Sequence, residues 1–404
     1  MASPHIKPAP GNLGVDQFAW YARMRRESPV YEDPRTGVIA VFGYDNTQRT
    51  LSEYASFSSE RGGSHASEEQ AISASMISSD PPRHRRLRNL VTQAFTPRAV
   101  AQLEPRIAAI VADLLDQMSA PGAVGSSGSS QSASTDFIDF IEAFASPLPV
   151  TVIAELLGVP PERRADFRRW SDALVSNGGA GGWSGAATAQ REMAMYFGEM
   201  IGRRRAEPRD DLISHLISAE IDGQRLTPVE LIGFCVLLLV AGNETTTNLL
   251  GGAVLAFDEH PEQWERLRAE PTLIPSAVEE VLRYNSPVQS MFRSAHAGAR
   301  LGEVVAWEGQ PIVAWIGSAN RDETQFEHPE RFDITRAPNR HLAFGHGIHF
   351  CLGAPLARLE ARVALEALAQ RARRIEVAPG AQLDWLESAI VYGVKQLPVA
   401  LIPA

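Results

Sequence analysis

The stretch FGHGIHFCLG, residues Phe344–Gly353, sets one cysteine, Cys351, among three glycines, and an amphipathic segment follows from Pro355. Glycines let the backbone come close to a bulky planar ligand, and they leave N–H groups free to hydrogen-bond a thiolate sulfur. A helix that begins after the loop adds partial positive charge, so we expect a lowered pKa for the Cys351 thiol. No CxxC or CxxCH pattern is present, which argues against a zinc ribbon or a covalently attached c-type haem. These residues alone leave open a tight loop around an inert cysteine.

As a whole, the ten residues resemble the haem-binding signature of the cytochromes P450. The resemblance implies that the protein binds haem b, with Cys351 as the proximal ligand of the iron. It further implies that Phe344 shields the sulfur, that Gly345 lies against the haem, and that His349 reaches a haem propionate. His346 competes as the ligand by residue type, but the resemblance places it at a variable position.

The resemblance covers the chain from about Val15 to Leu401 and implies the mainly α-helical P450 fold, with a long central helix over the haem and small β-sheets at the edge. A length of 404 residues would by itself suggest two or three domains, whereas the family implies a single domain over residues 1–404. We expect residues 1–14 to be flexible. The Gly/Ser-rich residues 121–135 are typical of a surface loop.

The apolar stretch Leu231–Phe257 is long enough to cross a membrane, but Glu244 lies at its centre. A central carboxylate costs about 2.5–3.5 kcal/mol on insertion scales, so a helix buried in a soluble protein is the better interpretation. Thr227 before Pro228, with Glu230 three residues later, predicts a capped start, and the helix should end near His260.

The middle of this helix, Ala241-Gly242-Asn243-Glu244-Thr245-Thr246, resembles the acid–alcohol motif of the same family. The resemblance implies that Thr245 holds and relays a proton to oxygen and that Glu244 supplies it. Ala241 and Gly242 would lie beside the haem, where the missing side chain of Gly242 admits oxygen and substrate. The alternative is a helix kink with a solvent-facing glutamate. An intact motif favours O₂ over peroxide as the oxidant.

Two further groups of residues match the family. Glu280 and Arg283 form an ExxR element on one helix face, and the segment Phe326–Asp333 resembles the meander that supplies a third member, Arg331. A surface salt bridge would explain Glu280 and Arg283 in isolation; with the cysteine loop, a buried network that fixes the geometry near the haem is the better interpretation.

The charge that haem requires is also present. The segment Asp80–Arg88 resembles the start of the family's C-helix, where His84 and Arg88 lie one turn apart, and Arg293 matches another propionate-binding position. Together with His349 these side chains would neutralise two propionates through charge-assisted hydrogen bonds. Any one of the arginines alone would be explained by a solvated surface.

The net charge, the N-terminal sequence and the number of cysteines limit which partners and which compartment we expect. A net charge of −10 without a basic tract argues against nucleic acid, and the N-terminus has no apolar anchor. With only two cysteines, Cys235 in an apolar run and Cys351, a reducing cytoplasm is the natural compartment. We expect a monomer. The alternatives to an O₂-dependent monooxygenase are a peroxide-driven peroxygenase and a non-catalytic haem sensor.

No flavin or ferredoxin domain is recognisable in the sequence, so we expect electrons from NAD(P)H through a separate ferredoxin and its reductase. An acidic ferredoxin would be steered to a basic patch on the proximal side. The candidate cations are Arg85, Arg86, Arg358 and Arg362.

The substrate is expected to be a medium to large lipophilic molecule, such as a fatty acid, terpenoid or steroid, bound by apolar burial without a charge clamp. Residues 177–185, with Trp183, look able to open and close over it, and Arg61 is a nearby cation for a carboxylate. By family position the lining side chains are Leu237, Val240, Val288, Met291, Phe292 and Val391.

Overall fold

The computed structural model describes residues 16–60, 75–119, 137–175 and 182–404. Its helices are α1 Gln17–Glu27, α2 Tyr44–Ser52, α3 Arg83–Ala94, α4 Pro97–Ala101, α5 Glu104–Met118, α6 Pro147–Leu156, α7 Arg164–Val175, α8 Gly182–Ala206, α9 Leu212–Ser218, α10 Pro228–Glu259, α11 Pro261–Ala269, α12 Ile274–Tyr284, α13 Ile316–Ala319 and α14 Ala354–Arg371. Short helical turns are Met76–Ser78, Ile141–Ala145, Pro161–Arg163, Pro271–Leu273 and Gly347–His349. The strands are β1 Val30–Glu32, β2 Ile39–Val41, β3 Phe57–Ser58, β4 Ile138–Asp139, β5 Met291–Ala295, β6 Arg300–Leu301, β7 Val304–Val305, β8 Pro311–Ala314, β9 Ala372–Val377 and β10 Pro398–Pro403.

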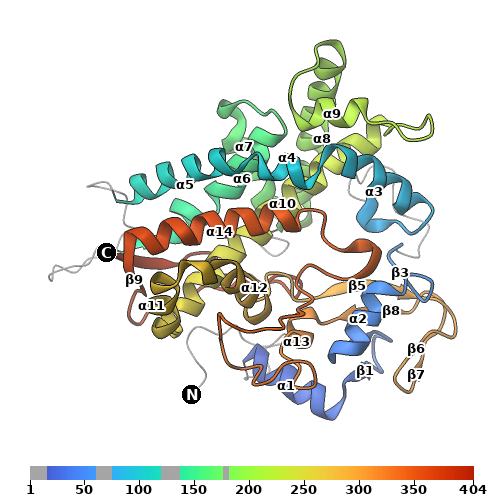
Figure 1. Ribbon diagram of the computed structural model, residues 1–404. Coiled ribbons are helices and arrows are strands. Elements are labelled where there is room, and N and C mark those ends of the chain that lie inside the picture. The colour runs from blue at the N-terminus through green and yellow to red at the C-terminus, as the bar shows by residue number, and fades with distance from the viewer. Residues whose placement is uncertain (1–15, 61–74, 120–136, 176–181) are drawn as a thin grey trace.

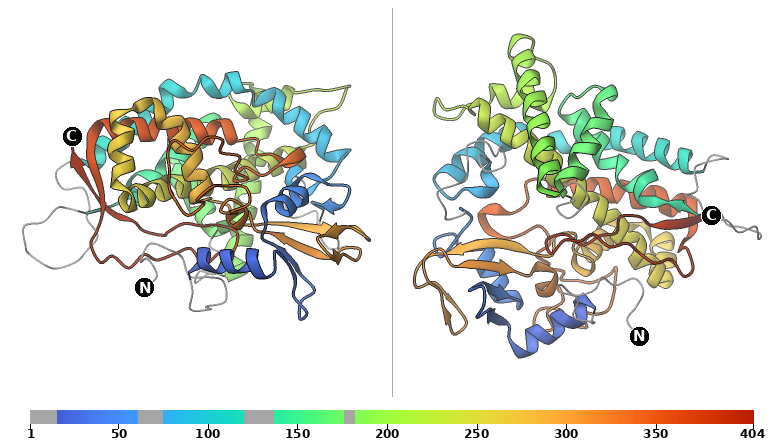
Figure 2. Two further views of the ribbon diagram at one scale, coloured as in Figure 1. Left: turned by 60° about the horizontal axis from the view of Figure 1, so that its bottom comes forward. Right: turned by 180° about the vertical axis from the view of Figure 1, so that it is seen from behind.

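The sheets are small and lie at the periphery of a helical body, as the sequence predicted. A five-stranded sheet has the order β1-β2-β8-β5-β3, a three-stranded sheet has the order β4-β10-β9, and β6 pairs with β7. The first two sheets lie on opposite sides of the molecule (Figures 1 and 2), and the helices α5 to α9 form its upper part in Figure 1.

The long helix α10 runs through the middle of the helical body (Figure 1). The hydroxyl of Thr227 accepts the N–H of Glu230, and the Glu230 carboxylate accepts the N–H of Thr227, so the predicted capping box is present. The helix ends at His260, whose N–H donates to the carbonyl of Ala256. Of the described helices, α10 alone is long and apolar enough to cross a membrane. It instead packs against α6, α7, α8 and α14, so much of its apolar surface contacts protein.

A buried ionic network ties α12 to the segment before the cysteine loop. Glu280 and Arg283 are fully buried and form two parallel hydrogen bonds of 2.8 Å. The third member is Arg336, not the predicted Arg331: the Nε of Arg336 lies 3.2 Å from both carboxylate oxygens of Glu280.

Arg331 enters this network only through its backbone. Its carbonyl accepts Arg283 Nη2 at 2.9 Å, while the residue itself is exposed. The chain folds back after Asp333, whose N–H also donates to Glu280, and this turn returns the Arg336 side chain to the buried carboxylate. The network therefore fixes the meander by binding both its backbone and one of its cations.

Four earlier expectations concern residues that the structure leaves undescribed, wholly or in part. The flexible N-terminus (1–14) and the Gly/Ser-rich loop (121–135) lie outside the described residues, as does Arg61. The glycine-rich stretch 177–185 does so in large part, and its last four residues form the start of α8. The single domain over residues 1–404 stays a prediction.

Candidate functional site

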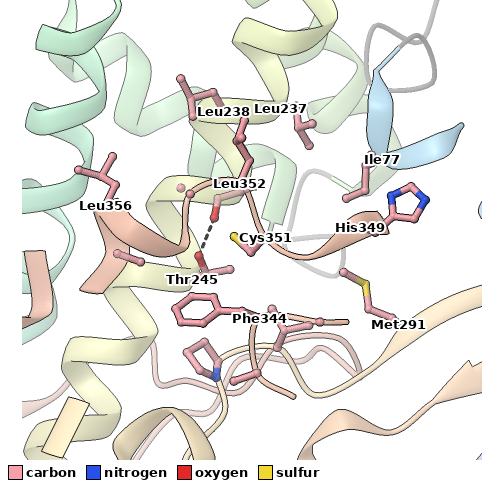
Figure 3. Close-up of a pocket in the computed structure, with 18 of the residues that line it drawn as sticks. Ile77, Leu237, Leu238, Thr245, Met291, Phe344, His349, Cys351, Leu352 and Leu356 are labelled. Carbon is pink, nitrogen blue, oxygen red and sulfur yellow. Dashed lines mark hydrogen bonds between the residues drawn. The ribbon is translucent and has the colours of Figure 1, made fainter. Parts of the chain in front are cut away.

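A cavity of about 230 Å³ lies between α10, α3, strand β5 and the loop that precedes α14. Cys351 and Thr245 approach it from different walls, and both face its centre (Figure 3). All ten haem-site and relay residues other than Glu244 line this one cavity: Cys351, Phe344, Gly345, His349, His84, Arg88, Arg293, Ala241, Gly242 and Thr245. The structure therefore brings together residues from four separate parts of the sequence.

The Cys351 thiol is held by backbone hydrogen bonds. Its own N–H donates to the Phe344 carbonyl at 2.9 Å, and its sulfur accepts the N–H groups of Gly353 and Ala354. Burial nevertheless raises the pKa of Cys351, with these N–H groups and the cations of Arg88 and Arg358 opposing it. The expected lowering of the thiol pKa was wrong for the protein alone, because desolvation outweighs the helix start. A bound cation at the sulfur would supply the missing stabilisation of the thiolate.

The loop conformation requires glycine at Gly347. Its φ is +71°, and a Cβ there would lie 2.7 Å from the Cα of Ser52 in α2. Both the left-handed backbone and the contact with α2 exclude a side chain. The loop thus rests directly on α2.

Arg358 on α14 contacts Phe344, the first residue of the cysteine loop. Its guanidinium lies over the Phe344 ring, 4.5 Å from the ring centroid, and it makes two hydrogen bonds of 2.7 and 2.8 Å to Glu279. His341 also bonds Glu279, at 3.0 Å. Although burial opposes it, these hydrogen bonds lower the pKa of Glu279 to about 2. Glu279 therefore fixes Arg358, which fixes the Phe344 ring next to the sulfur.

Four basic side chains converge on one rim of the cavity. The His84 and His349 rings lie 4.3 Å apart, and burial, His84, Arg293 and Arg88 lower the pKa of His349 to about 3. Burial also lowers the pKa of Arg88 and of Arg293. Among the described residues, Asp80 offsets this charge in part at His84 and Arg293, and Cys351 does so at Arg88.

A buried nitrogen in this cluster lacks a partner. His84 is 2% exposed, and its Nε2 has no hydrogen-bond partner among the described residues. Clustered cations that repel one another, next to an unsatisfied buried donor or acceptor, are expected where an anionic group binds. The residues present fit the two carboxylates of a haem, with the thiol in the same cavity.

On α10 the two residues of the acid–alcohol pair behave differently. The Thr245 hydroxyl donates to the Ala241 carbonyl at 2.6 Å, which leaves its lone pairs free to accept from the cavity (Figure 3). Glu244 does not line the cavity; its Oε1 accepts the amide of Asn248 at 2.9 Å. Gly242 lines the cavity, but a Cβ there would lie 2.5 Å from Ile153 Cδ1, so close packing of α6 on α10 is a second reason for this glycine.

Of the six predicted substrate contacts, Leu237, Val288 and Met291 line the cavity, and Val240, Phe292 and Val391 do not. Phe292 is 44% exposed because side chains alternate along β5, and Met291 and Arg293 take the inner face.

Val240 and Val391, the other two predicted contacts that do not line the cavity, are directed elsewhere by their local structure. Val240 faces the main hydrophobic core, since it lies on a different side of α10 from Leu237 and Ala241. The backbone of Val391 forms a bridge with Val288, and Val288 supplies the side chain that reaches the cavity.

Several lining residues were missed. Phe234 and Leu249 lie on the cavity face of α10, at helical spacing from Ala241 and Thr245, so the helical period would have found them. Glu360 was also missed; its signal is an acid that interrupts the apolar i, i+4 row Leu356, Glu360, Ala364 on α14.

The candidate cationic patch is largely neutralised within the protein. Arg86 pairs with Glu230 at the start of α10, Arg358 pairs with Glu279, and Arg362 pairs with Glu104 and Glu366. Arg85 is exposed and makes no ion pair with any described residue.

Comparisons with known proteins agree with this geometry. The family model described as Cytochrome P450 matches residues 186–384. The chain is similar to Cytochrome P450 109 of Bacillus spizizenii, with 44% identity over 95% of this chain and 91% of that protein. It is similar to the cytochrome P450 monooxygenase PikC of Streptomyces venezuelae, with 41% identity over 96% of this chain and 92% of that one. Its fold is similar to that of CYP109E1 from Bacillus megaterium in complex with testosterone, with a TM-score of 0.85 and 40% identity over 95% of this chain and 97% of that one.

Proposed function

The chain belongs to the cytochrome P450 family of haem b monooxygenases, and from this premise we propose that it inserts one oxygen atom of O₂ into a C–H or C=C bond of a neutral lipophilic substrate. The observation that carries the proposal is one apolar cavity with the Cys351 sulfur on one wall, the Thr245 hydroxyl on another and four basic side chains at its rim. The proposal includes electrons from NAD(P)H through a separate ferredoxin and reductase.

Haem bound to a thiolate supplies the activation of oxygen, and the protein holds and orients it. We assign Cys351 as the iron ligand, with Phe344 and Gly345 closing the loop around it. We assign His84, Arg88, Arg293 and His349 to the propionates, because these basic side chains gather at one rim of the cavity.

The hydroxyl of Thr245 is the proton relay. It already donates to Ala241, so it accepts a hydrogen bond from the cavity side and passes a proton on when its own O–H rotates. Glu244 is the acid of the same helix: it is only partly buried, which allows it to take protons from solvent. The amide of Asn248 donates to its carboxylate at 2.9 Å and holds it in place.

The cavity favours a neutral, apolar substrate. Leu237, Val288 and Met291 line it, together with Ile77 and Phe234. The two arginines among its described lining residues, Arg88 and Arg293, are both assigned to the propionates, so neither remains for a substrate carboxylate. Burial of apolar surface at about 25 cal/mol per Å² supplies the affinity. A steroid, terpenoid or fatty-acid chain fits these walls, and the related CYP109E1 has been solved with testosterone.

Electron delivery depends on the exposed surface near the thiol loop. Phe350, next to Cys351, is 39% exposed, and Arg85 is the exposed cation of the candidate patch that has no ion pair among the described residues. An acidic ferredoxin would make an apolar contact with Phe350 and would be steered by the charge of Arg85. We also propose that the protein acts as a monomer in the cytoplasm, supported by its free cysteines Cys235 and Cys351 and by the burial of α10.

Spin-shift titration of the haem-loaded protein tests the substrate class. Neutral, anionic and cationic ligands of similar size are compared, starting with a steroid, a fatty acid and a lipophilic amine. We expect neutral ligands to give the largest spin shift and to bind most tightly. Tight binding confined to small polar or cationic molecules would contradict the proposed substrate.

Turnover with NAD(P)H, ferredoxin and reductase is then compared with turnover on added peroxide alone. Product that depends on O₂ and reductant supports a monooxygenase. Product formed only with peroxide identifies a peroxygenase, and no product with any bound ligand favours a sensor.

A further inference from the structure

A cluster of three buried polar side chains lies outside the functional site described above. Gln17 and Tyr21 belong to α1 and Gln289 lies between α12 and β5, and their exposed fractions are 2%, 0% and 1%. The Gln17 amide donates to the Tyr21 hydroxyl at 2.6 Å and to Gln289 Oε1 at 2.7 Å. The Tyr21 hydroxyl donates to the same oxygen at 2.9 Å. The three side chains therefore form a closed ring of hydrogen bonds in the interior.

Gln289 is the member that connects this cluster to other segments. Its side-chain amide donates to the Ser286 carbonyl at 2.6 Å, and its backbone N–H donates to the Ile390 carbonyl at 2.7 Å. Its own carbonyl accepts the N–H of Gly317 in α13 at 3.1 Å. A Cβ at Gly317 would overlap Gln289 Oε1, so the glutamine side chain also explains this glycine. Gln289 thus joins α1, α13 and the loop of Ile390 at one point.

Residues next to Gln289 and Gly317 form part of the cavity wall. Val288 and Met291 line the cavity, and so does Ile316, the residue before Gly317. Gln289 itself does not line it. Because the backbone of Gln289 is hydrogen-bonded to that of Gly317, a displacement of the glutamine would move all three lining side chains.

The docking of α1 does not depend on the polar cluster. The rings of Trp20 and Tyr21 pack against Trp315, with ring centroids 5.3 and 5.6 Å apart, and α1 lies beside α13 (Figure 1). Three apolar side chains in place of the cluster would keep these contacts and avoid the burial of polar groups. Hydrogen bonds fix direction as well as distance, so a fully satisfied polar cluster specifies one arrangement of the segments that it joins. Stability alone therefore does not account for it.

We propose that Gln289, held by Gln17 and Tyr21, is a positioning residue that determines which carbon of the bound substrate is oxidised. The proposal rests on the proposed monooxygenase function. Gln289 acts through the three lining side chains next to it. A lipophilic substrate without a charge clamp is oriented by the shape of the wall, and a misplacement of about 1 Å can change a rate by about 100-fold. The choice of carbon is therefore sensitive to a cluster none of whose members lines the cavity.

Gln289→Met tests the positioning without turnover. Methionine is close to glutamine in length, but it leaves the Gln17 amide and the Tyr21 hydroxyl without their shared acceptor. In the resting haem-loaded protein, amide hydrogen exchange should quicken by about tenfold in peptides that cover residues 286–293 and 316–320. An unsatisfied buried group loosens a segment locally by about this much.

Gln310→Met is the matched control. Gln310 is also fully buried, and its amide donates to Glu32 in β1 and to the Gly37 carbonyl. Neither Gln310 nor these two partners line the cavity. Both variants should lose about 2–3 °C in the thermal midpoint, since each leaves buried polar groups unsatisfied. Only Gln289→Met should quicken exchange in the two segments of the cavity wall.

Turnover tests the choice of carbon, with testosterone as the first steroid probe. The ratio of its oxidation products should change by about tenfold in Gln289→Met and by less than about twofold in Gln310→Met. A triple variant, Gln17→Leu with Tyr21→Phe and Gln289→Met, makes the whole cluster apolar. It should regain thermal stability, because no side chain of the cluster is left with an unsatisfied polar group. It should keep the altered product ratio, because no hydrogen bonds direct the segment of residue 289.

The outcomes separate positioning from stability. An unchanged product ratio in Gln289→Met, with normal haem content, refutes the positioning role. A ratio that changes equally in Gln310→Met, or that returns to the wild-type value in the triple variant, follows stability and also refutes it. A wild type that gives no product with any bound ligand refutes the proposed function, whereas the exchange in the two segments still shows whether Gln289 holds the wall.

Discussion

Replacing Arg336 with alanine should destabilise the protein far more than replacing Arg331, although both arginines lie in the same meander. Arg336 is 11% exposed at its side chain and bonds both oxygens of the fully buried Glu280. It also donates to the carbonyls of Glu327, His328 and Arg331. Its loss removes all of these bonds at once.

The expected loss of stability in Arg336→Ala depends on the hydrogen bonds that Glu280 keeps. Breaking a buried ion pair costs about 3–5 kcal/mol when the remaining charge is left alone. Glu280 keeps two bonds from Arg283 and one each from the Asp333 N–H and the Asn339 amide, so the lower end applies. We expect about 3 kcal/mol for Arg336→Ala, or a fall of about 3–4 °C in the thermal midpoint for a chain of 404 residues.

Arg331→Ala keeps the backbone carbonyl that Arg283 uses, so it should cost no more than about 0.5 kcal/mol, as a surface substitution does. The assay is thermal unfolding followed by far-UV circular dichroism, with haem absorbance in parallel. Equal destabilisation by the two substitutions would refute the assignment of Arg336 as the third member.

Three other predictions concern the thiol loop and α10. Cys351→Ala should lose the strongly red-shifted Soret band of the reduced carbon monoxide complex, while Cys235→Ala, at a buried thiol whose pKa burial raises to about 12, keeps it. Thr245→Ala should bind haem and substrate but divert electrons to peroxide, and unchanged product per NAD(P)H would remove Thr245 from the relay. Glu279→Gln should cost about 1–2 kcal/mol after allowance for solvent screening. Because the pKa of Glu279 is lowered from 4.5 to about 2, this difference from wild type is present above pH 4.5 and vanishes as the pH falls toward 2, which urea unfolding across that range measures.

The cysteine loop and the long helix could be predicted because their signals are local. The left-handed φ of Gly347 is a reason for glycine that lies within the loop itself, and the capping box at Thr227 fixes where α10 begins. Each depends on residues a few positions apart, or on a pattern that one segment carries alone.

What could not be predicted depends on how the chain folds back. Arg331 and Arg336 are both arginines of one irregular segment, and only the turn after Asp333 decides which side chain returns to Glu280. Phe292 was placed in the pocket by its apolar character, whereas the register of β5 against β8 sends it outward. In both places the sequence shows which residue types are present, whereas the turn or the strand pairing decides which side chain points inward.

The ion pair between Arg86 and Glu230 has a consequence for enzyme engineering. It joins α3, which carries His84 and Arg88, to the first turn of α10, where Glu230 also caps the helix. Substitutions that enlarge the cavity along α10 will shift that first turn and so disturb the ion pair between Arg86 and Glu230. Libraries aimed at bulkier substrates should therefore lose cofactor in proportion to how far they displace α10, and a screen for retained haem should precede any screen for new products.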